Sequence, residues 1–316
     1  MSSAGPWADL ARPPLGEGAL RAALEAPAGP LGRLVVEREI ASTSTALAER
    51  ARAEPDRWPD LSVLVAEHQT QGRGRRGRTF TTAPRAALTA SVLLRTPAGS
   101  APALPWLPLL AGLAVVEELR RRAGVEAVLK WPNDVLVPAP PGRPGAVEDA
   151  PPAKVCGVLA EVLPPGAGDG GPVRPGPVVV VGWGLNVDAR AEELPPAGAT
   201  SLRLAGAAST DRDLLLRAVL RRQAVLYARW RAVVAEPDAA AAARALAALT
   251  DPVREVCSTL GRSVRVELPG GEVLEGAAEA LDASGALVVR TADGARALTA
   301  GDVVHVRPAG AGDGRG

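Results

Sequence analysis

The chain has 316 residues, of which 47% are apolar, and it carries a net charge of +1 with only two cysteines and two histidines. This length suits one large domain or two unequal ones, and the balanced charge gives no global indication of a nucleic-acid or membrane partner. Cys156 and Cys257 form no CxxC pair. The composition therefore favours a reducing, cytoplasmic compartment and offers no usual metal-ligand cluster. No signal peptide or membrane span is expected.

The first part of the chain alternates between strand and helix patterns. After a variable lead-in, a short strand is predicted at 32–40, and the hydroxyl residues of "STST" can cap a following helix. An apolar run predicts a buried strand at 60–70. A second strand is predicted at 85–96, where Leu88, Ala90, Val92 and Leu94 alternate with Thr89, Ser91 and Leu93. Residues 104–124 predict a helix that ends in a basic turn and a glycine.

The second part continues with three predicted strands near 126–137, 154–163 and 177–187. Pro/Gly-rich segments at 138–153 and 164–176 separate them, and we interpret both as surface loops. Residues 211–250 are alanine-rich and helical in pattern. After about residue 257, short period-2 strands between "PGG", "DASG" and "ADG" turns predict a small all-β domain.

The stretch "AEHQTQGRGRRGRTF" (66–80) contains four arginines within residues 73–78, here called the arginine loop. Its GxGxxG pattern is not a dinucleotide fingerprint, because no helix opens at its end. The arginines repel one another, so we expect a loop that becomes ordered when a polyanion binds. A solvated basic loop that contacts RNA is the simpler alternative.

Only two of the 36 basic residues are lysines, and both lie in unusual segments. Lys130 belongs to "LKWPNDVLV" and Lys154 to "AKVCGVLAEV". A simple turn would explain the first segment, but survival of lysine in such an arginine-rich chain favours a compact anion site, which an ammonium fits better than a planar guanidinium. Gly182 and Gly184 in "VVVGWGLNV" suggest, taken alone, a β-bulge.

Together and in this order, these segments resemble the biotin protein ligases, also called biotin–[acetyl-CoA-carboxylase] ligases, over residues 33–307. The pair "GRGRRGR" and "KWPND" carries most of the resemblance, and lipoate ligases share the fold but lack this arginine loop. The short N-terminus resembles the class without a DNA-binding domain. The sequence departs from the usual pattern at Ser44, where asparagine is common, and at Phe80, where tryptophan is common.

The resemblance implies an α/β catalytic domain with a mixed sheet at 33–250 and an SH3-like β-barrel at 257–308, flanked by a lead-in (1–32) and a disordered tail (309–316). It also implies ATP and Mg²⁺ as cofactors, biotin as substrate and a biotin carboxyl carrier protein as partner. In such enzymes the biotin carboxylate attacks the α-phosphate of ATP. A carrier lysine then attacks the resulting biotinyl-5′-AMP.

Residue by residue, the resemblance assigns biotin contacts to Ser42, Thr43, Gln69, Gly72, Arg73, Arg75, Lys154 and Gly157. It assigns ATP or adenylate contacts to Arg76, Arg78, Phe80, Lys130, Asn133, Asn186 and, as a further candidate, Arg307. Catalysis is expected of Lys154, Asp134, Lys130 and Arg75. Asp134 would orient or deprotonate the carrier lysine, whose free pKa is about 10.4. Asn133 is the candidate contact for the metal.

Two other functions stay open at this point. A lipoate or octanoate ligase would use the same fold. A nucleic-acid-binding module would use the arginine loop, although no aromatic residues are interleaved with its arginines.

Overall fold

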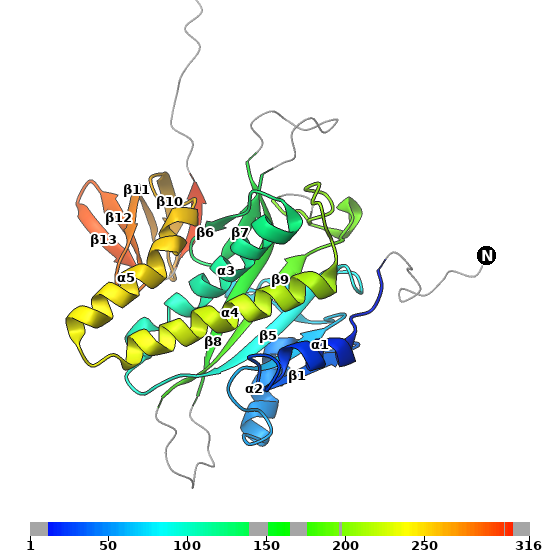
Figure 1. The fold of residues 1–316 in the computed structure, drawn as a ribbon. Helices are drawn as coiled ribbons and strands as arrows, with labels where there is room; N and C mark the ends of the chain where they lie inside the picture. The colour runs from blue at the N-terminus through cyan, green and yellow to red at the C-terminus, as the bar shows by residue number, and fades with distance from the viewer. Residues whose placement is uncertain (1–11, 139–150, 165–175, 196–197, 300, 306–316) are drawn as a thin grey trace, which may run out of the picture.

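The computed structural model describes residues 12–138, 151–164, 176–195, 198–299 and 301–305 (Figure 1). The predicted tail at 309–316, residue Arg307 and most of the two Pro/Gly-rich loops lie outside these residues. Within them, the chain forms a large mixed sheet flanked by helices and a second, smaller antiparallel sheet. The predicted α/β class is confirmed.

The large sheet has seven strands, and its central strands are the longest. Only β1 and β2 run parallel, and every other neighbouring pair is antiparallel. In spatial order the strands are β1 (Arg33–Glu37), β2 (Ser62–Ala66), β5 (Ala87–Arg95), β9 (Val178–Asn186), β8 (Ala153–Leu163), β7 (Asp134–Val137) and β6 (Val128–Lys130). The predicted strands at 32–40, 60–70, 85–96, 154–163 and 177–187 are therefore present, and the segment at 126–137 forms a two-stranded hairpin.

Helices cover the two faces of this sheet unequally (Figure 1). On one face, α3 (Trp106–Glu118), its continuation (Leu119–Ala123) and α4 (Arg212–Ala235) bury the main core. The alternating residues Leu88, Ala90, Val92 and Leu94 of β5 point into that core. On the other face, α2 (Thr43–Ala53) packs over Leu64, Leu93 and Val180. The alternation read from the sequence thus places Thr89 and Ser91 on the face that α2 covers only in part.

The N-terminal segment is held against the large sheet by buried charges. It carries helix α1 (Glu17–Leu24), and before that helix Arg12 donates to Asp188 at 3.0 Å and to Glu193 at 3.0 and 2.5 Å. Glu67 accepts from Arg212 at 2.6 Å and from the backbone N–H of residue 15 at 2.6 Å. Because these groups are buried and paired, they fix the chain just beyond the ends of β2 and β9.

The alanine-rich region forms two helices instead of one continuous segment. Helix α4 ends at Ala235, and α5 (Ala239–Val256) begins after Asp238, whose side chain accepts from the N–H of Ala241 at 2.6 Å. This capping bond starts a new helix and lets the chain reverse. As a result α5 leads directly into the small domain (Figure 1).

The small domain is a five-stranded antiparallel sheet in the order β13 (Gly294–Leu298), β12 (Leu287–Thr291), β11 (Val273–Leu281), β10 (Ser263–Glu267) and β14 (Asp302–His305). Its strands alternate buried and exposed residues, as the period-2 pattern predicts. The described strand pairs leave β13 and β14 as sheet edges, so the expected SH3-like barrel is an open sheet in its hydrogen bonding.

Two tryptophans fix the small domain against the part of the chain that forms the large sheet. Trp106 in α3 donates to the carbonyl of Ala283 at 2.8 Å, and Trp131 donates from its ring to the carbonyl of Gly285 at 3.2 Å. The backbone N–H of Trp131 also donates to Thr259 at 3.0 Å. These buried bonds hold the small domain beside the β6–β7 hairpin. Within the described residues, no helix has the length and apolarity needed to cross a membrane.

Candidate active site

The sheet face opposite α3 and α4 carries a cavity of about 340 Å³ between the start of α2, the arginine loop, the β6–β7 hairpin and β14. Its floor consists of small residues on neighbouring strands. Gly157, Gly182 and Gly184 line it, and a Cβ at Gly184 would lie 2.7 Å from ring carbons of Phe80. These glycines are required because other groups pack directly on the backbone. The strand register through Gly182 and Gly184 is continuous on both sides, so the β-bulge interpretation is wrong.

One end of the cavity is a buried set of hydroxyl and amide groups. Gln69 accepts from the backbone N–H of Thr43 at 2.7 Å and from its hydroxyl at 3.0 Å. The Ser91 hydroxyl lies 2.8 Å from that of Thr43 and 2.9 Å from that of Ser44. Ser42 caps helix α2 by accepting from the N–H of residue 45 at 3.4 Å. The helix N-terminus therefore brings short, neutral donors and acceptors to one place, which suits an uncharged polar ligand.

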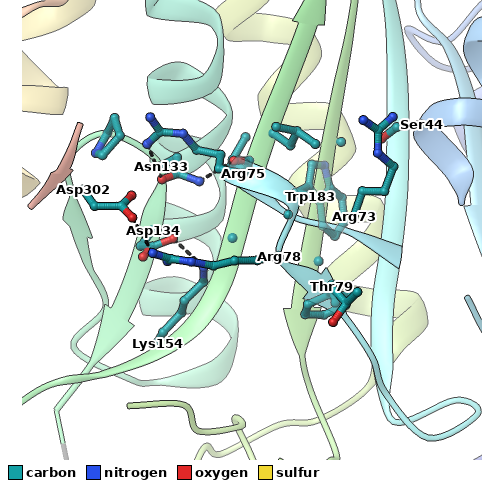
Figure 2. Close-up of a pocket in the computed structure, with 18 of the residues that line it drawn as sticks. Ser44, Arg73, Arg75, Arg78, Thr79, Asn133, Asp134, Lys154, Trp183 and Asp302 are labelled. Carbon is teal, nitrogen blue, oxygen red and sulfur yellow. Dashed lines mark hydrogen bonds and ion pairs between the residues drawn. The ribbon is translucent and has the colours of Figure 1, made fainter. Parts of the chain in front are cut away.

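The arginine loop forms a hairpin over the cavity (Figure 2). Strands β3 (Gly72–Arg73) and β4 (Thr79–Phe80) pair, and a 3₁₀ turn at Arg75–Gly77 joins them. A Cβ at Gly72 would lie 2.9 Å from Gln69, so glycine allows the close approach of the loop.

The side chains of the arginine loop are held by groups from several elements. Arg75 donates to Asn133 at 3.2 Å and to the carbonyl of Gly301 at 3.4 Å. Arg73 forms an ion pair of 3.3 Å with Glu161, and Arg78 forms one with Asp302. The loop thus bridges the large sheet and the small domain.

The charged centre lies on the adjacent strands β6, β7 and β8. The Nζ of Lys154 is 2.6 Å from the Oδ1 of Asp134, and Asp134 pairs in register with Lys130 on one side and Gly157 on the other. The backbone of Lys154 is fixed by the N–H bond to Gly198 and by accepting from Thr200, both at 2.8 Å. The hairpin turn and the strand register together place two ammonium groups around one carboxylate.

Burial lowers the pKa of Lys130 from its ordinary value of 10.5. Lys154 and Arg78 lower that pKa further, whereas Asp134 and Asp302 act in the opposite direction. An anion bound near Lys130 would stabilise its charged form, because a nearby opposite charge offsets burial and the neighbouring cations. Cys156, by contrast, is a buried core residue whose pKa burial raises to about 12, so its thiol is protonated at neutral pH.

Comparison with known proteins agrees with this arrangement. Residues 36–172 match the biotin/lipoate A/B protein ligase family, and residues 259–306 match the biotin protein ligase C terminal domain. The chain is 38% identical to biotin–[acetyl-CoA-carboxylase] ligase of Mycobacterium tuberculosis over 302 residues, which cover 95% of this chain and 98% of that protein. The chain belongs to the biotin protein ligase family.

Further relatives support the same assignment. A ligase of the same name from Paracoccus denitrificans is 30% identical and covers 84% of this chain and 98% of its own length. A biotin protein ligase from Aquifex aeolicus, solved in complex with biotin and ATP, superposes with a TM-score of 0.62 at 26% identity. That match covers 87% of this chain and 99% of the Aquifex chain.

Most of the predicted site residues of this ligase lie together. Those that line the cavity are Ser42, Thr43, Gln69, Arg73, Arg75, Arg78, Phe80, Lys130, Asn133, Asp134, Lys154 and Gly157. Gly72 is not among the lining residues, but it lies beside Gln69, which is. The side chain of Arg76 and all of Arg307 lie outside the described part of the chain, so their contacts stay predictions. The specific ligand assigned to each residue also stays a prediction.

Asn186 lies on the same sheet face as Gly182 and Gly184, because alternate residues of a strand share a face. Its amide nitrogen donates to the carbonyl of Thr200 at 3.0 Å. Its Oδ1 is buried and, among the described residues, has no hydrogen-bond partner. Asn186 is not among the residues that line the cavity, so its contact with the adenylate stays a prediction, whereas Asn133 lines the cavity and its Oδ1 accepts from Arg75.

Sequence reasoning did not find several lining residues of the ligase. Trp183 and Leu159 contribute through strand positions that look like ordinary core, and Trp131 contributes from the turn between β6 and β7. Asp302 comes from β14 of the small domain, more than 160 residues beyond the "KWPND" segment in the sequence. No local pattern marks it, because only the packing of the two domains brings it into the cavity.

Proposed function

We propose that this protein is an ATP-dependent ligase that activates biotin as biotinyl-5′-AMP and transfers the biotinyl group to a lysine of a biotin carboxyl carrier protein. The observation that carries the proposal is the cavity itself. It has a neutral end of hydroxyl and amide groups and a cationic end, and the Lys154–Asp134 ion pair joins two of the strands that line it, β8 and β7. A ureido ring, a carboxylate and a nucleotide phosphate together require that combination.

In the first step, a biotin carboxylate oxygen attacks the α-phosphorus of ATP. The new C–O–P linkage forms as the bond from the α-phosphorus to the bridging oxygen breaks, and pyrophosphate leaves with the electron pair. Both reactants are anions, so their approach depends on cations. All four side chains line the cavity, and we expect Lys154 and Arg75 to contact the carboxylate and Lys130 and Arg78 to contact the phosphates.

In the second step, the carrier lysine must attack as a neutral amine. Asp134, which lines the cavity, is the expected acceptor for its proton, once Lys154 has left Asp134 to bind the substrate. The amine nitrogen then attacks the biotinyl carbonyl carbon. The carbon–oxygen bond to the phosphate breaks, and AMP leaves.

Mg²⁺ accompanying ATP would add a Lewis acid at the phosphates. The described residues contain no cluster of three or more His, Cys, Asp or Glu that could hold a metal ion, which fits a metal carried mainly by the nucleotide. Asn133, which lines the cavity, is the candidate for a further contact with the metal. The proposal also includes the expected cytoplasmic location.

The decisive experiment is a streptavidin blot of a carrier domain after incubation with the protein, biotin and Mg-ATP. A carrier whose acceptor lysine is replaced by arginine is the control and should give no band. Pyrophosphate exchange with biotin or lipoate in parallel tests the choice of acid. Exchange that depends on lipoate and not on biotin would contradict the proposal.

A further inference from the structure

The arginine loop contacts the small domain at one short segment. Arg75 donates to the carbonyl of Gly301 at 3.4 Å, and the guanidinium of Arg78 forms an ion pair with Asp302 (Figure 2). Arg78 is otherwise a surface residue, with 68% of its side chain exposed, whereas the Asp302 side chain is 21% exposed. The carboxylate is therefore the better-fixed member of the pair.

The position of Asp302 depends on the docking of the small domain. Its strand, β14, pairs in register with β10 from Val264 to Glu267. The domain itself is fixed by the bonds of Trp106 and Trp131 described above. Asp302 thus enters the cavity on a rigid element, in contrast to the loop arginine that it binds.

The charge of Asp302 is opposite to what a polyphosphate needs. The described lining residues include five basic side chains, Arg73, Arg75, Arg78, Lys130 and Lys154, and two acidic ones, Asp134 and Asp302. Asp302 also lies close enough to Lys130 to oppose the lowering of the Lys130 pKa. The field of the Asp302 carboxylate therefore reaches beyond Arg78. A triphosphate entering this end of the cavity must compete with the Asp302 carboxylate for the same cations.

We propose that Asp302 is a positioning residue. It holds Arg78 in an ion pair before ATP binds, and it releases Arg78 to the phosphates when ATP binds. While the cavity is empty, the ion pair keeps the arginine loop against the small domain and neutralises part of its charge. When ATP binds, Arg78 turns to the phosphates. After the first step, Asp302 reclaims Arg78 and repels pyrophosphate, which favours its release. This proposal rests on the proposed function, because the nucleotide is the competing anion.

Asp302→Asn tests the exchange because it removes the charge and keeps the shape. We expect the KM for ATP to fall about two- to fivefold, the effect of removing one partly exposed competing ion pair. The inhibition constant of pyrophosphate should fall by a similar factor, and the KM for biotin should not change. Raising the salt concentration should reduce the difference in KM for ATP between Asp302→Asn and the unaltered protein, because salt screens the charge of Asp302. A residue with a purely structural role would instead lower kcat and stability without tightening nucleotide binding.

Two matched variants serve as controls. Asp302→Glu keeps the charge and should restore values near those of the unaltered protein. Asp293→Asn makes the same change in an exposed turn of the same domain and should leave every constant unchanged.

Limited proteolysis in the absence of substrates provides a second measurement. Trypsin should cleave the arginine loop faster in Asp302→Asn than in the unaltered protein, because the loop has lost its anchor. An unchanged cleavage rate, or a KM for ATP that is unchanged or higher, would overturn the proposal. Failure of the unaltered protein to form the biotinyl adenylate would instead overturn the proposed function, and the cleavage comparison would still test the Arg78–Asp302 contact.

Discussion

The ammonium group of Lys154 lies 2.6 Å from the Oδ1 of Asp134 on the neighbouring strand. The ion pair therefore joins a residue proposed for the first step of the reaction to one proposed for the second. In this ion pair each group neutralises the other. We expect Lys154 to form an ion pair with the biotin carboxylate in place of Asp134 when biotin binds. Asp134 would then be able to accept a proton. One ion pair would thus keep both groups inactive until the substrate is in place.

Replacement of either lysine by arginine tests whether a compact ammonium is required. We expect Lys154→Arg and Lys130→Arg to slow biotinyl-adenylate formation on the order of 10²-fold, because a planar guanidinium cannot occupy the same donor positions at the reacting anion. Biotin-dependent pyrophosphate exchange measures this step. Arg265→Lys, the reverse exchange on an exposed position of β10, is the control and should have no effect. Unaltered rates in both lysine variants would refute the assignment.

Asp134→Asn separates the two steps of the reaction. The variant cannot accept a proton, so we expect transfer from purified biotinyl-5′-AMP to the carrier to slow by about 10²- to 10⁴-fold. Adenylate formation should be affected much less, because Lys154 keeps its charge and its backbone anchors at Gly198 and Thr200. Single-turnover measurements of each step provide the comparison. A variant that slows adenylate formation more than transfer would show that Asp134 acts chiefly by holding Lys154.

How much of this site the sequence predicts depends on how local the signal is. Ser91 and the residues around it alternate with period 2, and that pattern alone assigns the two faces of β5. The "KWPND" segment carries a turn and its charged residues in five positions. Asp302 carries no such signal, because only the packing of domains distant in the sequence brings it into the cavity. Gly182 and Gly184 stand out in the sequence, but their local pattern suggests a bulge, since the groups that pack on them come from other parts of the chain.

The same reasoning explains two differences in the fold. The break between α4 and α5 depends on the capping of Asp238 and on a chain reversal, and neither is apparent in an alanine-rich run. The edges of the small sheet depend on which strands pair, and short period-2 strands do not determine their partners.

The lowered pKa of Lys130 predicts a pH dependence of nucleotide binding. The folded-state pKa lies below the ordinary value of 10.5, so Lys130 loses its charge at a lower pH than a free lysine. We expect the KM for ATP to rise as the pH increases through this window, and Lys130→Arg to abolish that rise, since arginine stays charged.

The same shift affects stability with the opposite sign. Between the folded-state pKa of Lys130 and 10.5, the unfolded chain binds more protons than the folded one, so the contribution of Lys130 to the free energy of unfolding increases with pH. Urea unfolding of the unaltered protein and of Lys130→Met across this range measures the contribution as a difference. For nucleotide binding, a KM for ATP that falls with increasing pH would contradict the predicted loss of charge on Lys130.

Gly182→Ala tests the floor of the cavity. A Cβ at this position would overlap the Ser44 hydroxyl and lie 3.1 Å from that of Ser91, so the hydroxyl cluster must move. We expect the affinity for biotin to fall about tenfold, the equivalent of roughly 1.4 kcal/mol of overpacking. Isothermal titration with biotin in the absence of ATP measures this directly.

Gly18→Ala in helix α1 is the matched control for the Gly182 variant, because a Cβ there meets no atom within 4 Å. It should leave biotin binding unchanged and stabilise the fold by about 0.5–1 kcal/mol, since alanine loses less backbone entropy than glycine on forming a helix. If Gly182→Ala bound biotin as tightly as the control, the small residues of β9 would only fill space, and the neutral end of the cavity would not extend over this strand.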